Sequence, residues 1–255
     1  MTDSVLWREL TAERLRERAS AGALVLLPVA STEQHGPHLA TGVDDVLCSD
    51  ICRRVAEALV AAGRPAIVAP TLWCGLAEHH VAFGGSFTLT LPTYHALLRD
   101  LCRSVLRAGF RQILIVNGHG GNMSALAALT VELTRELDAP IATTTYFLAA
   151  EEEFASILED QRAVLHACEA ETSMMMVVRP DLVDAAELPN AFGQAAESPS
   201  AILSPVLNRW RSFRELTESG VMGDARRANP NKGERLIQAV VQAIAGRLLA
   251  GEPWA

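Results

Sequence analysis

Residues 31–38 read Ser-Thr-Glu-Gln-His-Gly-Pro-His, and Asp44 follows nine residues after His35. Glu33 and His35 are two residues apart, so on extended backbone both side chains project to the same side. The glycine and proline that follow end a strand, because glycine permits a sharp turn and proline cannot donate to a ladder. Two such donors with a carboxylate close behind could clamp a metal where substrate can reach it. A solvated loop is the alternative, since short motifs often occur without a function.

A second polar motif, Asn-Gly-His-Gly-Gly-Asn, occupies residues 117–122 and contains His119. It follows an apolar run that predicts a strand over residues 112–116 and precedes a predicted helix over residues 122–137. Its glycines let the backbone pass close to a bound group, and a helix N-terminus favours negative charge. A phosphate-binding loop is the competing interpretation. The spacing matches neither standard phosphate loop, and a histidine stands where a small residue is expected, so we favour a metal.

A third motif, His-Ala-Cys-Glu-Ala-Glu-Thr-Ser, occupies residues 166–173. His166 and Glu169 are three residues apart and would share a face if a helix has already begun there. One of them could bind a metal while the other transfers protons. Glu171 would then face elsewhere. Two roles remain open for it: a structural one, as a helix cap or in a buried hydrogen bond, and a direct catalytic one.

Alternating strands and helices carry these motifs. We predict strands over residues 23–30, 66–69, 112–116 and 141–145, and helices over residues 11–21, 45–62, 92–108, 122–137 and 233–249. This alternation predicts an α/β protein, with a mainly parallel sheet between two helix layers in a single domain over residues 1–255. Residues 185–223 are less regular and read as a lid or as surface filler. Because ligands of parallel sheets bind beyond the carboxyl ends of the strands, His35 and His119 should meet at one edge.

The residues after the second predicted strand should reach the same edge. They include Trp73 and the run Glu78-His79-His80. A third metal ligand is conceivable in this run, but we favour a pocket wall or substrate contact for Glu78 and His79. Trp73 is expected either to line that pocket or to pack in the ordinary way.

Composition excludes several classes of protein. The 255 residues are 49% hydrophobic and 20% charged, which is typical of a globular chain. A net charge of −8, spread along the chain, argues against a nucleic-acid partner. Apolar runs are too short to span a bilayer and the N-terminus lacks a signal pattern, so we expect no membrane partner and a cytoplasmic location. Five cysteines predict no disulfide framework. Cys48 and Cys52 are expected as buried helix residues rather than metal ligands.

The three motifs together resemble those of the creatininase (creatinine amidohydrolase) family. The resemblance extends to Gly-Val-Met-Gly-Asp at residues 220–224 and Asn-Lys-Gly-Glu at residues 231–234, so it spans residues 33–234. It implies a three-layer α/β/α domain that binds two divalent metals, often zinc or manganese, and assembles as a homo-oligomer, usually a hexamer. Members of the family hydrolyse non-peptide amides, including cyclic amides and formamides, and one branch trims a peptide-derived cofactor precursor.

The resemblance also implies metal ligands. Glu33, Asp44 and His119 resemble the ligands of one ion. His35 and Asp44 resemble ligands of the other, so Asp44 would bridge the two. Spacing alone does not choose between Asp44 and the adjacent Asp45, and the resemblance favours Asp44. His166 resembles the pocket histidine of the family, which assists proton transfer or holds substrate.

The sequence departs from creatininase directly after His119. Creatininase has an aromatic residue and then a glutamate there, whereas this chain has Gly120 and Gly121. The second metal thereby loses a carboxylate, and we predict that Glu169, one turn beyond His166, replaces it. The pocket loses an aromatic wall at Gly120, so creatinine itself is not the expected substrate.

These observations predict a binuclear amidohydrolase that cleaves a small-molecule cyclic amide or formamide. Two divalent ions, zinc or manganese and conceivably iron, would activate a water to hydroxide and polarise the carbonyl. Asn117, Asn122 and Thr32 are candidates for orienting the ligands, although Asn122 is expected to cap the following helix. Two alternatives remain open: a mononuclear zinc peptidase-like hydrolase that trims a small peptide-derived precursor, and a non-catalytic metal-binding protein on the same fold.

Overall fold

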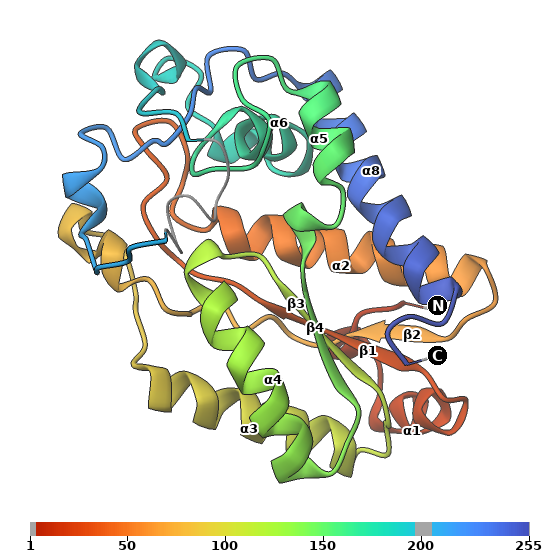
Figure 1. Cartoon of the computed structure of the whole chain (residues 1–255). Coiled ribbons are helices and arrows are strands. Elements are labelled where there is room, and N and C mark those ends of the chain that lie inside the picture. Colours follow the sequence, from red (N-terminus) through yellow and green to blue (C-terminus); the bar gives the residue numbers. More distant parts are fainter. Residues whose placement is uncertain (1–3, 197–205, 255) are drawn as a thin grey trace.

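The computed structural model describes residues 4–196 and 206–254. Its centre is a parallel sheet whose strands follow the order β2-β1-β3-β4 (Figure 1). The strands are β1 (Leu24–Val29), β2 (Ala66–Val68), β3 (Ile113–Asn117) and β4 (Ile141–Thr145). Each of the predicted strands is therefore present, and the predicted α/β class with a parallel sheet is confirmed.

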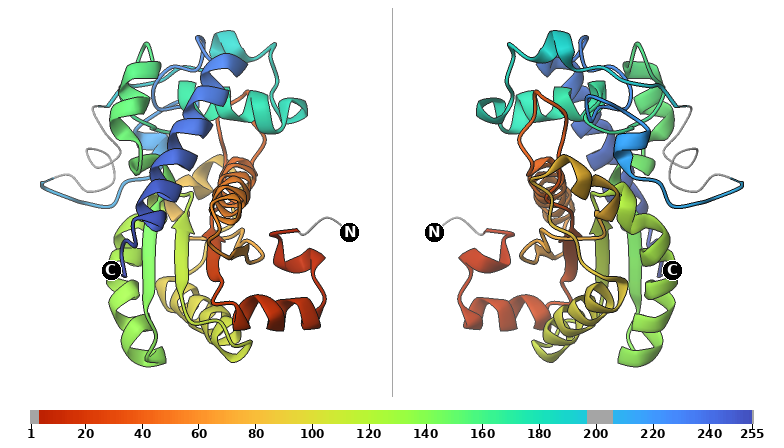
Figure 2. Two further views of the ribbon diagram at one scale, coloured as in Figure 1. Left: turned by 90° about the vertical axis from the view of Figure 1, so that its right-hand side faces the viewer. Right: turned by 90° about the vertical axis from the view of Figure 1, so that its left-hand side faces the viewer.

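Helices cover both faces of this sheet, which makes three layers (Figures 1 and 2). On one face lie α2 and α8, with α5 and α6 beyond them, and on the other lie α1, α3 and α4. Their bounds are α1 (Ala12–Ser20), α2 (Val43–Ala61), α3 (Leu91–Arg107), α4 (Met123–Leu137), α5 (Glu151–Ile157), α6 (Glu169–Val178) and α8 (Pro230–Leu249).

Strand β1 explains why the sheet needs cover on both faces. All of its side chains are buried, and they alternate between two hydrophobic cores. Leu24 and Leu26 join the core under α2 and α8, whereas Val25 and Leu27 join the core over α3 and α4. Burying each such side chain contributes about 1.5–3 kcal/mol. The almost unbroken apolar run that predicts this strand is the sequence signature of that double burial.

The sheet register brings two predicted motifs together. Val29 pairs with Asn117, so β1 and β3 end side by side and the segments after them leave the sheet at the same edge. The first segment runs from Ala30 into the N-terminus of α2, which begins at Val43. Asp44 is thus in the first turn of that helix, where a carboxylate is stabilised by the helix dipole.

The irregular segment that we predicted as a lid or surface filler has a definite part in the fold. Residues 197–205 of it lie outside the described residues. The described remainder contains two short 3-10 turns, Leu188–Asn190 and Phe213–Glu215. Phe213 is buried, and its capping residue Ser212 accepts from the backbone amide of Arg214 at 3.4 Å. This turn therefore brings an aromatic side chain into the interior of the protein.

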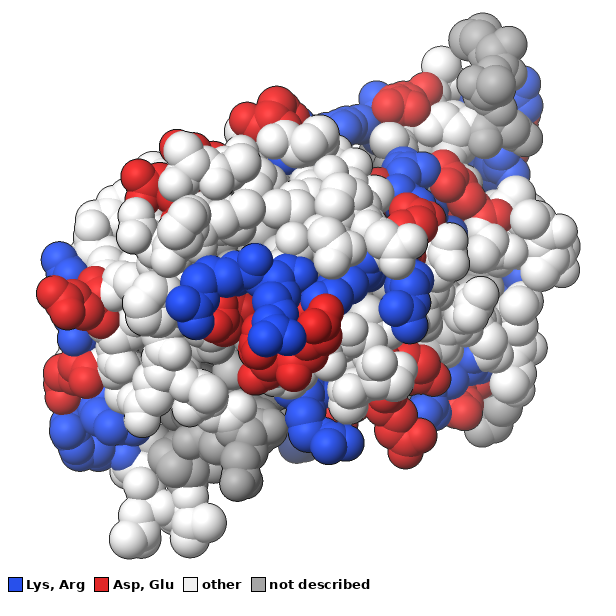
Figure 3. Space-filling model, turned by 90° about the horizontal axis from the view of Figure 1, so that it is seen from above, with Lys and Arg blue, Asp and Glu red and all other residues white. Residues whose placement is uncertain are grey.

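The surface shows no segregation of charge on the face seen in Figure 3, where basic side chains lie among acidic ones. Across residues 4–196 and 206–254, no helix combines the length and apolar character that crossing a bilayer requires.

Candidate active site

Two buried carboxylates and an imidazole converge where β1 and β3 end. His119 Nδ1 lies 3.1 Å from Glu33 Oε1 and 3.1 Å from Asp44 Oδ2. All three side chains are at most 3% exposed. Removing two carboxylates from water is costly unless positive charge or hydrogen bonds compensate them. The cluster therefore requires a cation or protons at its centre.

The tautomer of His119 favours a cation. Its Nε2 lies 3.2 Å from the backbone carbonyl oxygen of Leu76. Because a carbonyl oxygen only accepts hydrogen bonds, Nε2 of the neutral ring carries the proton. The lone pair of Nδ1 then faces the two carboxylates. Three electron-pair donors aimed at one point, with the ring held from behind by a backbone carbonyl, is the arrangement in which histidine binds a metal.

His35 repeats this arrangement on the other side of Asp44. Its Nδ1 donates to the backbone carbonyl oxygen of Glu33 at 3.1 Å, so the lone pair is on Nε2, which lies 3.2 Å from Asp44 Oδ1. The two oxygens of Asp44 thus face the lone pairs of two different imidazoles. Among the described residues, Glu33 Oε2, Asp44 Oδ2 and His35 Nε2 are buried and make no hydrogen bond. Such buried, unpaired donors could hold a divalent cation.

The raised pKa values of His119 and His35 also indicate that the buried carboxylates favour a positive charge beside them. Burial by itself lowers the pKa of His119, but the Glu33 and Asp44 carboxylates raise it well above its usual range. For His35, burial also lowers the pKa, but Asp44 raises it to about 9. A metal ligand must be deprotonated, so a bound cation would replace these protons and supply the charge that the carboxylates attract.

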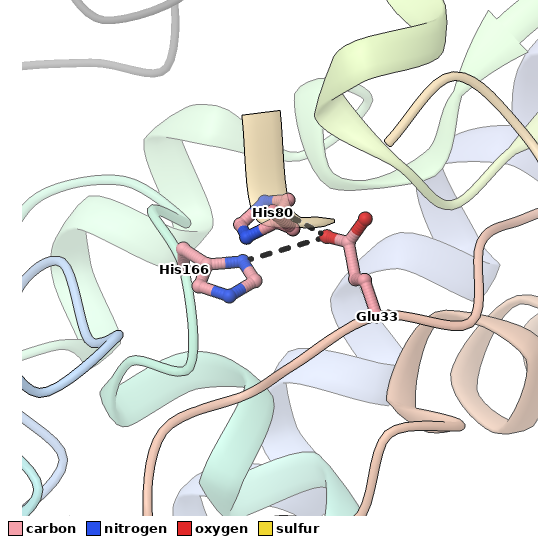
Figure 4. A group of neighbouring side chains, drawn as sticks. All are labelled: Glu33, His80 and His166. Carbon is pink, nitrogen blue, oxygen red and sulfur yellow. Dashed lines mark ion pairs between the residues drawn. The ribbon is translucent and has the colours of Figure 1, made fainter. Parts of the chain in front are cut away.

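Two further histidines approach Glu33 from other parts of the chain (Figure 4). His80 Nε2 lies 3.2 Å and His166 Nδ1 lies 3.7 Å from Glu33 Oε1. His80 comes from the 3-10 helix Glu78–Phe83 that follows β2, and His166 from the segment before α6. Burial lowers the pKa of both rings well below the usual value, so both are neutral near pH 7.

Gln34 fixes the orientation of these two rings. Its side-chain Nε2 donates to His80 Nδ1 at 2.9 Å and to the Gly220 carbonyl oxygen at 3.1 Å. His80 must then carry its proton on Nε2 and donate toward Glu33. The backbone carbonyl oxygen of Gln34 accepts from His166 Nε2 at 2.8 Å. The lone pair of His166 is therefore on Nδ1, which faces the carboxylates.

The structure does not bring Glu169 to this cluster, contrary to the position that we predicted for it. Its carboxylate accepts hydrogen bonds from Lys232 Nζ and from the backbone amides of Glu159 and Asp160. Glu171 lies at the cluster instead. One ligand atom from each of His35, His166 and Glu171 lies within 4.8 Å of the others. Burial raises the pKa of Glu171 to about 7, which indicates a carboxylate without adequate compensation.

Glu171 also helps to cap the N-terminus of α6, which is one of the roles that the sequence left open. Its Oε2 accepts from the backbone amide of Cys168, the residue before the first turn of α6, at 3.4 Å. This bond is long, so it leaves most of the accepting capacity of the carboxylate unused. The same carboxylate has a ligand atom within 4.8 Å of those of His35 and His166, so it can serve both the helix and the cluster.

Two asparagines hold the loop that carries His119. Asn117 Oδ1 accepts from the His119 backbone amide at 3.1 Å, and its Nδ2 donates to the His119 carbonyl oxygen at 2.8 Å. Asn122 does not cap α4 with its side chain, so that prediction is wrong. Its Oδ1 accepts from the Leu76 backbone amide at 3.0 Å instead. It therefore positions the strand-end segment whose carbonyl oxygen holds His119.

Hydrophobic residues enclose the cluster. Phe213 packs on His80 with ring centroids 4.3 Å apart and on His166 at 5.0 Å. Phe147 and Leu165 line the same cavity. This apolar enclosure limits the access of water and strengthens electrostatic interactions inside.

The predicted substrate-contacting residues have different positions. His79 and Gly120 line the cavity above the cluster. Glu78 is exposed and is not among the residues that line the cavity of the cluster, so the structure does not bring it to the site. Trp73 is 49% exposed, packs edge-on against Phe87 and borders a different hollow. Thr32 donates to the Trp73 carbonyl oxygen at 3.1 Å and so holds the neighbouring segment rather than a ligand.

Nearly the whole chain is similar in sequence to proteins of one known family. Residues 8–248 match the creatininase family model, described as creatinine amidohydrolase. A mycofactocin precursor peptide peptidase from Mycolicibacterium smegmatis is 34% identical over 93% of this chain and 89% of its own length. The creatinine amidohydrolase of Pseudomonas putida is 28% identical over 96% of each chain.

Solved structures agree with the sequences. A crystal structure of creatinine amidohydrolase superimposes with a TM-score of 0.83 at 27% identity and covers 99% of each chain. Two further structures are described as creatininase Mn, with a TM-score of 0.83, and as a mutant creatininase of Zn-Zn type, with a TM-score of 0.82. Each is 26% identical to this chain. The first match covers 98% of this chain and the second covers 99%, and both cover 100% of the creatininase chain.

The fold, the buried cluster of carboxylates and imidazoles, and the full-length match therefore lead to one conclusion. The chain belongs to the creatininase family and is a hydrolase that acts on the carbon–nitrogen bonds of amides.

Proposed function

We propose that this chain is a binuclear metal-dependent amide hydrolase in which Asp44 bridges two divalent cations. The observation that carries the proposal is that the two Asp44 oxygens face the lone pairs of His119 and His35, at 3.1 and 3.2 Å. Glu33 would complete the ligands of the ion on the His119 side. Zinc and manganese both suit nitrogen and oxygen ligands, and related creatininases are described as a manganese form and as a Zn-Zn form.

Glu171 is our candidate for the second carboxylate, in place of Glu169. It lies with His35 and His166 in a group whose ligand atoms are within 4.8 Å of one another. In this chain Gly120 and Gly121 follow His119, so the neighbouring loop offers no carboxylate. A buried carboxylate from α6 supplies the missing negative charge from the opposite side of the site.

When bound, divalent cations acidify a water and polarise the amide carbonyl. The residues of the chain supply the remaining functions. His166 presents the Nδ1 lone pair to the site, because its Nε2 proton is committed to the Gln34 carbonyl oxygen. It can accept the proton from the attacking water and pass it to the departing nitrogen, which leaves poorly as an anion. The low pKa of this buried ring makes its protonated form a strong donor.

Counting bound metal tests the binuclear proposal. Wild-type protein saturated with zinc or manganese should hold two ions per chain by elemental analysis. Asp44→Asn should lose both, whereas Glu33→Gln and Glu171→Gln should each retain one. Glu57→Gln is the control, since Glu57 lies on the exposed face of α2, the helix that carries Asp44, with its carboxylate on Arg53, and it should keep two. One ion per chain in the wild type, or two in Glu171→Gln, would contradict the proposal.

The substrate requires a separate test. We expect the metal-loaded enzyme to hydrolyse members of a library of lactams, cyclic ureides and formamides, with products measured by mass spectrometry. His166→Asn should retain two ions yet lose turnover. Failure of every compound in the presence of bound metal would favour a metal-binding protein without catalysis.

A peptide-derived substrate is the second candidate, and the similarity to a mycofactocin precursor peptide peptidase favours it. The library therefore includes short peptides with free carboxyl termini. Release of a terminal fragment from them, with no cleavage of lactams or formamides, would select this candidate. A hexameric assembly stays a prediction.

A further inference from the structure

A second hollow of about 320 Å³ adjoins the metal-binding cavity. The two hollows share His79, Gly120, Gly121 and Phe213 as lining residues, so a molecule bound in one can extend into the other. The outer hollow adds residues from the described segment before and around the turn at Phe213 and from the first turn of α4. These are Ser124, Asn208, Arg209, Trp210, Arg211 and Leu216.

The outer hollow has an unbalanced positive charge. The described residues that line it include two arginines and no carboxylate. Arg209 already has a partner, since its guanidinium lies 3.2 Å from Glu215 Oε2 and also donates to the Trp210 carbonyl oxygen at 3.3 Å. Arg211 is half-buried, and within the part of the chain that the structure describes it makes no ion pair or hydrogen bond. The cation that faces the hollow without compensation is therefore Arg211.

Most of the other arginines that have no ion pair or hydrogen bond within the described residues are exposed, for example Arg16, Arg135 and Arg235, whereas Arg211 is half-buried. The protein has 30 acidic residues against 22 basic ones, so carboxylate partners are abundant. Other arginines form ion pairs with such carboxylates, for example Arg227 with Glu159 at 2.9 Å and Arg179 with Asp181 at 2.6 Å. A guanidinium never loses its charge near neutral pH, and withdrawing it from water without a partner costs free energy. A bound anion would offset that cost.

We infer that Arg211 is a specificity-determining residue and that the substrate is an amide that also carries an oxyanion group. The inference rests on the proposed function, because it places the scissile amide at the metal cavity and the anion in the outer hollow. The planar fork of the guanidinium matches a carboxylate or a phosphate with two parallel hydrogen bonds. Trp210, which is 64% exposed, offers an aromatic face to the carbon skeleton between the two groups.

Matched substrate pairs test this inference with the metal-loaded enzyme. Each N-formyl or N-acyl amino acid is compared with its uncharged carboxamide, and phosphorylated amides are compared with their alcohols. We expect kcat/KM to favour the anionic member by about 10- to 100-fold, which corresponds to about 1.4–2.7 kcal/mol. A preference confined to the first pair identifies a carboxylate, and one confined to the second identifies a phosphate. Equal kcat/KM within both pairs would overturn the inference.

Variants assign the preference to one residue. Arg211→Gln should bring the ratio within each pair close to one, mainly through a higher KM for the anionic member, with two metals still bound. Arg211→Lys should retain part of the preference, because the charge remains while the fork is lost. Arg209→Gln removes a neighbouring charge that is already paired and should change the ratio less than twofold. An unchanged ratio in Arg211→Gln would show that another group selects the substrate.

A binding measurement separates this inference from the proposed function. Glutaramic acid and glutaramide are the probes, in calorimetric titrations of the metal-loaded protein. Tighter binding of the acid in the wild type, but not in Arg211→Gln, would support the anion subsite even if no amide is hydrolysed. Hydrolysis of amides without any dependence on the charge or on Arg211 would leave the proposed function standing and refute the subsite.

Discussion

The carboxylate of Glu169 accepts a hydrogen bond from Nζ of Lys232, the one lysine in the sequence. Glu169 is fully buried, and the side chain of Lys232 is 8% exposed. The ammonium group also donates to the Arg227 carbonyl oxygen at 2.9 Å. This pair joins the first turn of α6 to the first turn of α8. Glu169 therefore holds the helix that carries Glu171 in place, rather than binding a metal.

We predict that Lys232→Met destabilises the protein by about 3–5 kcal/mol, because it leaves a buried carboxylate without a positive charge to compensate it. Chemical denaturation measures this change. Arg226→Gln is the control, since its pair with Asp224 is largely exposed and its loss should cost at most about 1 kcal/mol. Equal losses in the two variants would show that the Glu169–Lys232 pair does not stabilise the fold.

The helical spacing of His166 and Glu169 did not predict the position of Glu169, because the backbone turns between them. The spacing of His166 and Glu169 places both on one face only if the helix has already begun at His166. In the structure α6 begins at Glu169, and Ala167 has a left-handed backbone with φ of 51°. The turn at Ala167 changes the phase, so Glu171 points to the site in place of Glu169. Nothing in the helical periodicity predicts a left-handed alanine.

The strand-end residues could be predicted because the sheet itself positions them. His35 and His119 follow two apolar runs that have to be central strands, and neighbouring parallel strands end at the same edge. The run that contains His80 was also expected at this edge, but its contact with Glu33 is made from a 3-10 helix. Gln34 and Phe213, which the sequence did not indicate, reach the site through a loop and a 3-10 turn. Their positions depend on long-range packing, which no local pattern records. For Trp73 the sequence left a pocket wall and ordinary packing open. Its indole is half exposed and packs edge-on against Phe87 in the loop that follows β2, which agrees with the second alternative.

Gly121 provides a steric test of the metal site. A Cβ there would collide with His119 Nε2, the Leu76 carbonyl oxygen and the His79 ring. Gly121→Ala should therefore push apart the hydrogen bond that fixes the His119 tautomer. We predict a destabilisation of about 1–3 kcal/mol and weaker metal binding. Both are measured by thermal denaturation and metal titration.

Gly246→Ala is the matched control for this substitution. Gly246 lies within α8, and a Cβ there meets nothing within 4 Å. The same chemical change should raise stability by about 0.5–1 kcal/mol, because alanine favours a helix interior over glycine. Loss of metal affinity in Gly246→Ala as well would show that the effect at Gly121 is not local.

Gln34 should influence metal binding without touching the metal. Its amide donates to His80 Nδ1, and His80 in turn donates to Glu33. Gln34→Leu frees the His80 ring to turn, so Glu33 loses a fixed hydrogen-bond donor. We predict a loss of metal affinity of about 10- to 100-fold, measured by competition with a chromogenic chelator. Gln238→Leu, on the exposed face of α8, should leave the affinity unchanged. Equal affinities in wild type and Gln34→Leu would mean that His80 is held by its packing on Phe213 alone.

Metal removal should lower the stability of the folded chain. Without cations, Glu33 and Asp44 remain buried side by side, and their charge has to be neutralised by protons on His35 and His119. A ligand that binds only the folded state at 100 times its Kd adds about 2.7 kcal/mol of stability. We therefore expect dialysis against a chelator to reduce Tm by several degrees, and added zinc or manganese to restore it. In Asp44→Asn, which lacks the bridging carboxylate, Tm should not respond to either treatment. If neither chelator nor added metal changed the Tm of the wild type, the cluster would not hold a cation in the folded protein.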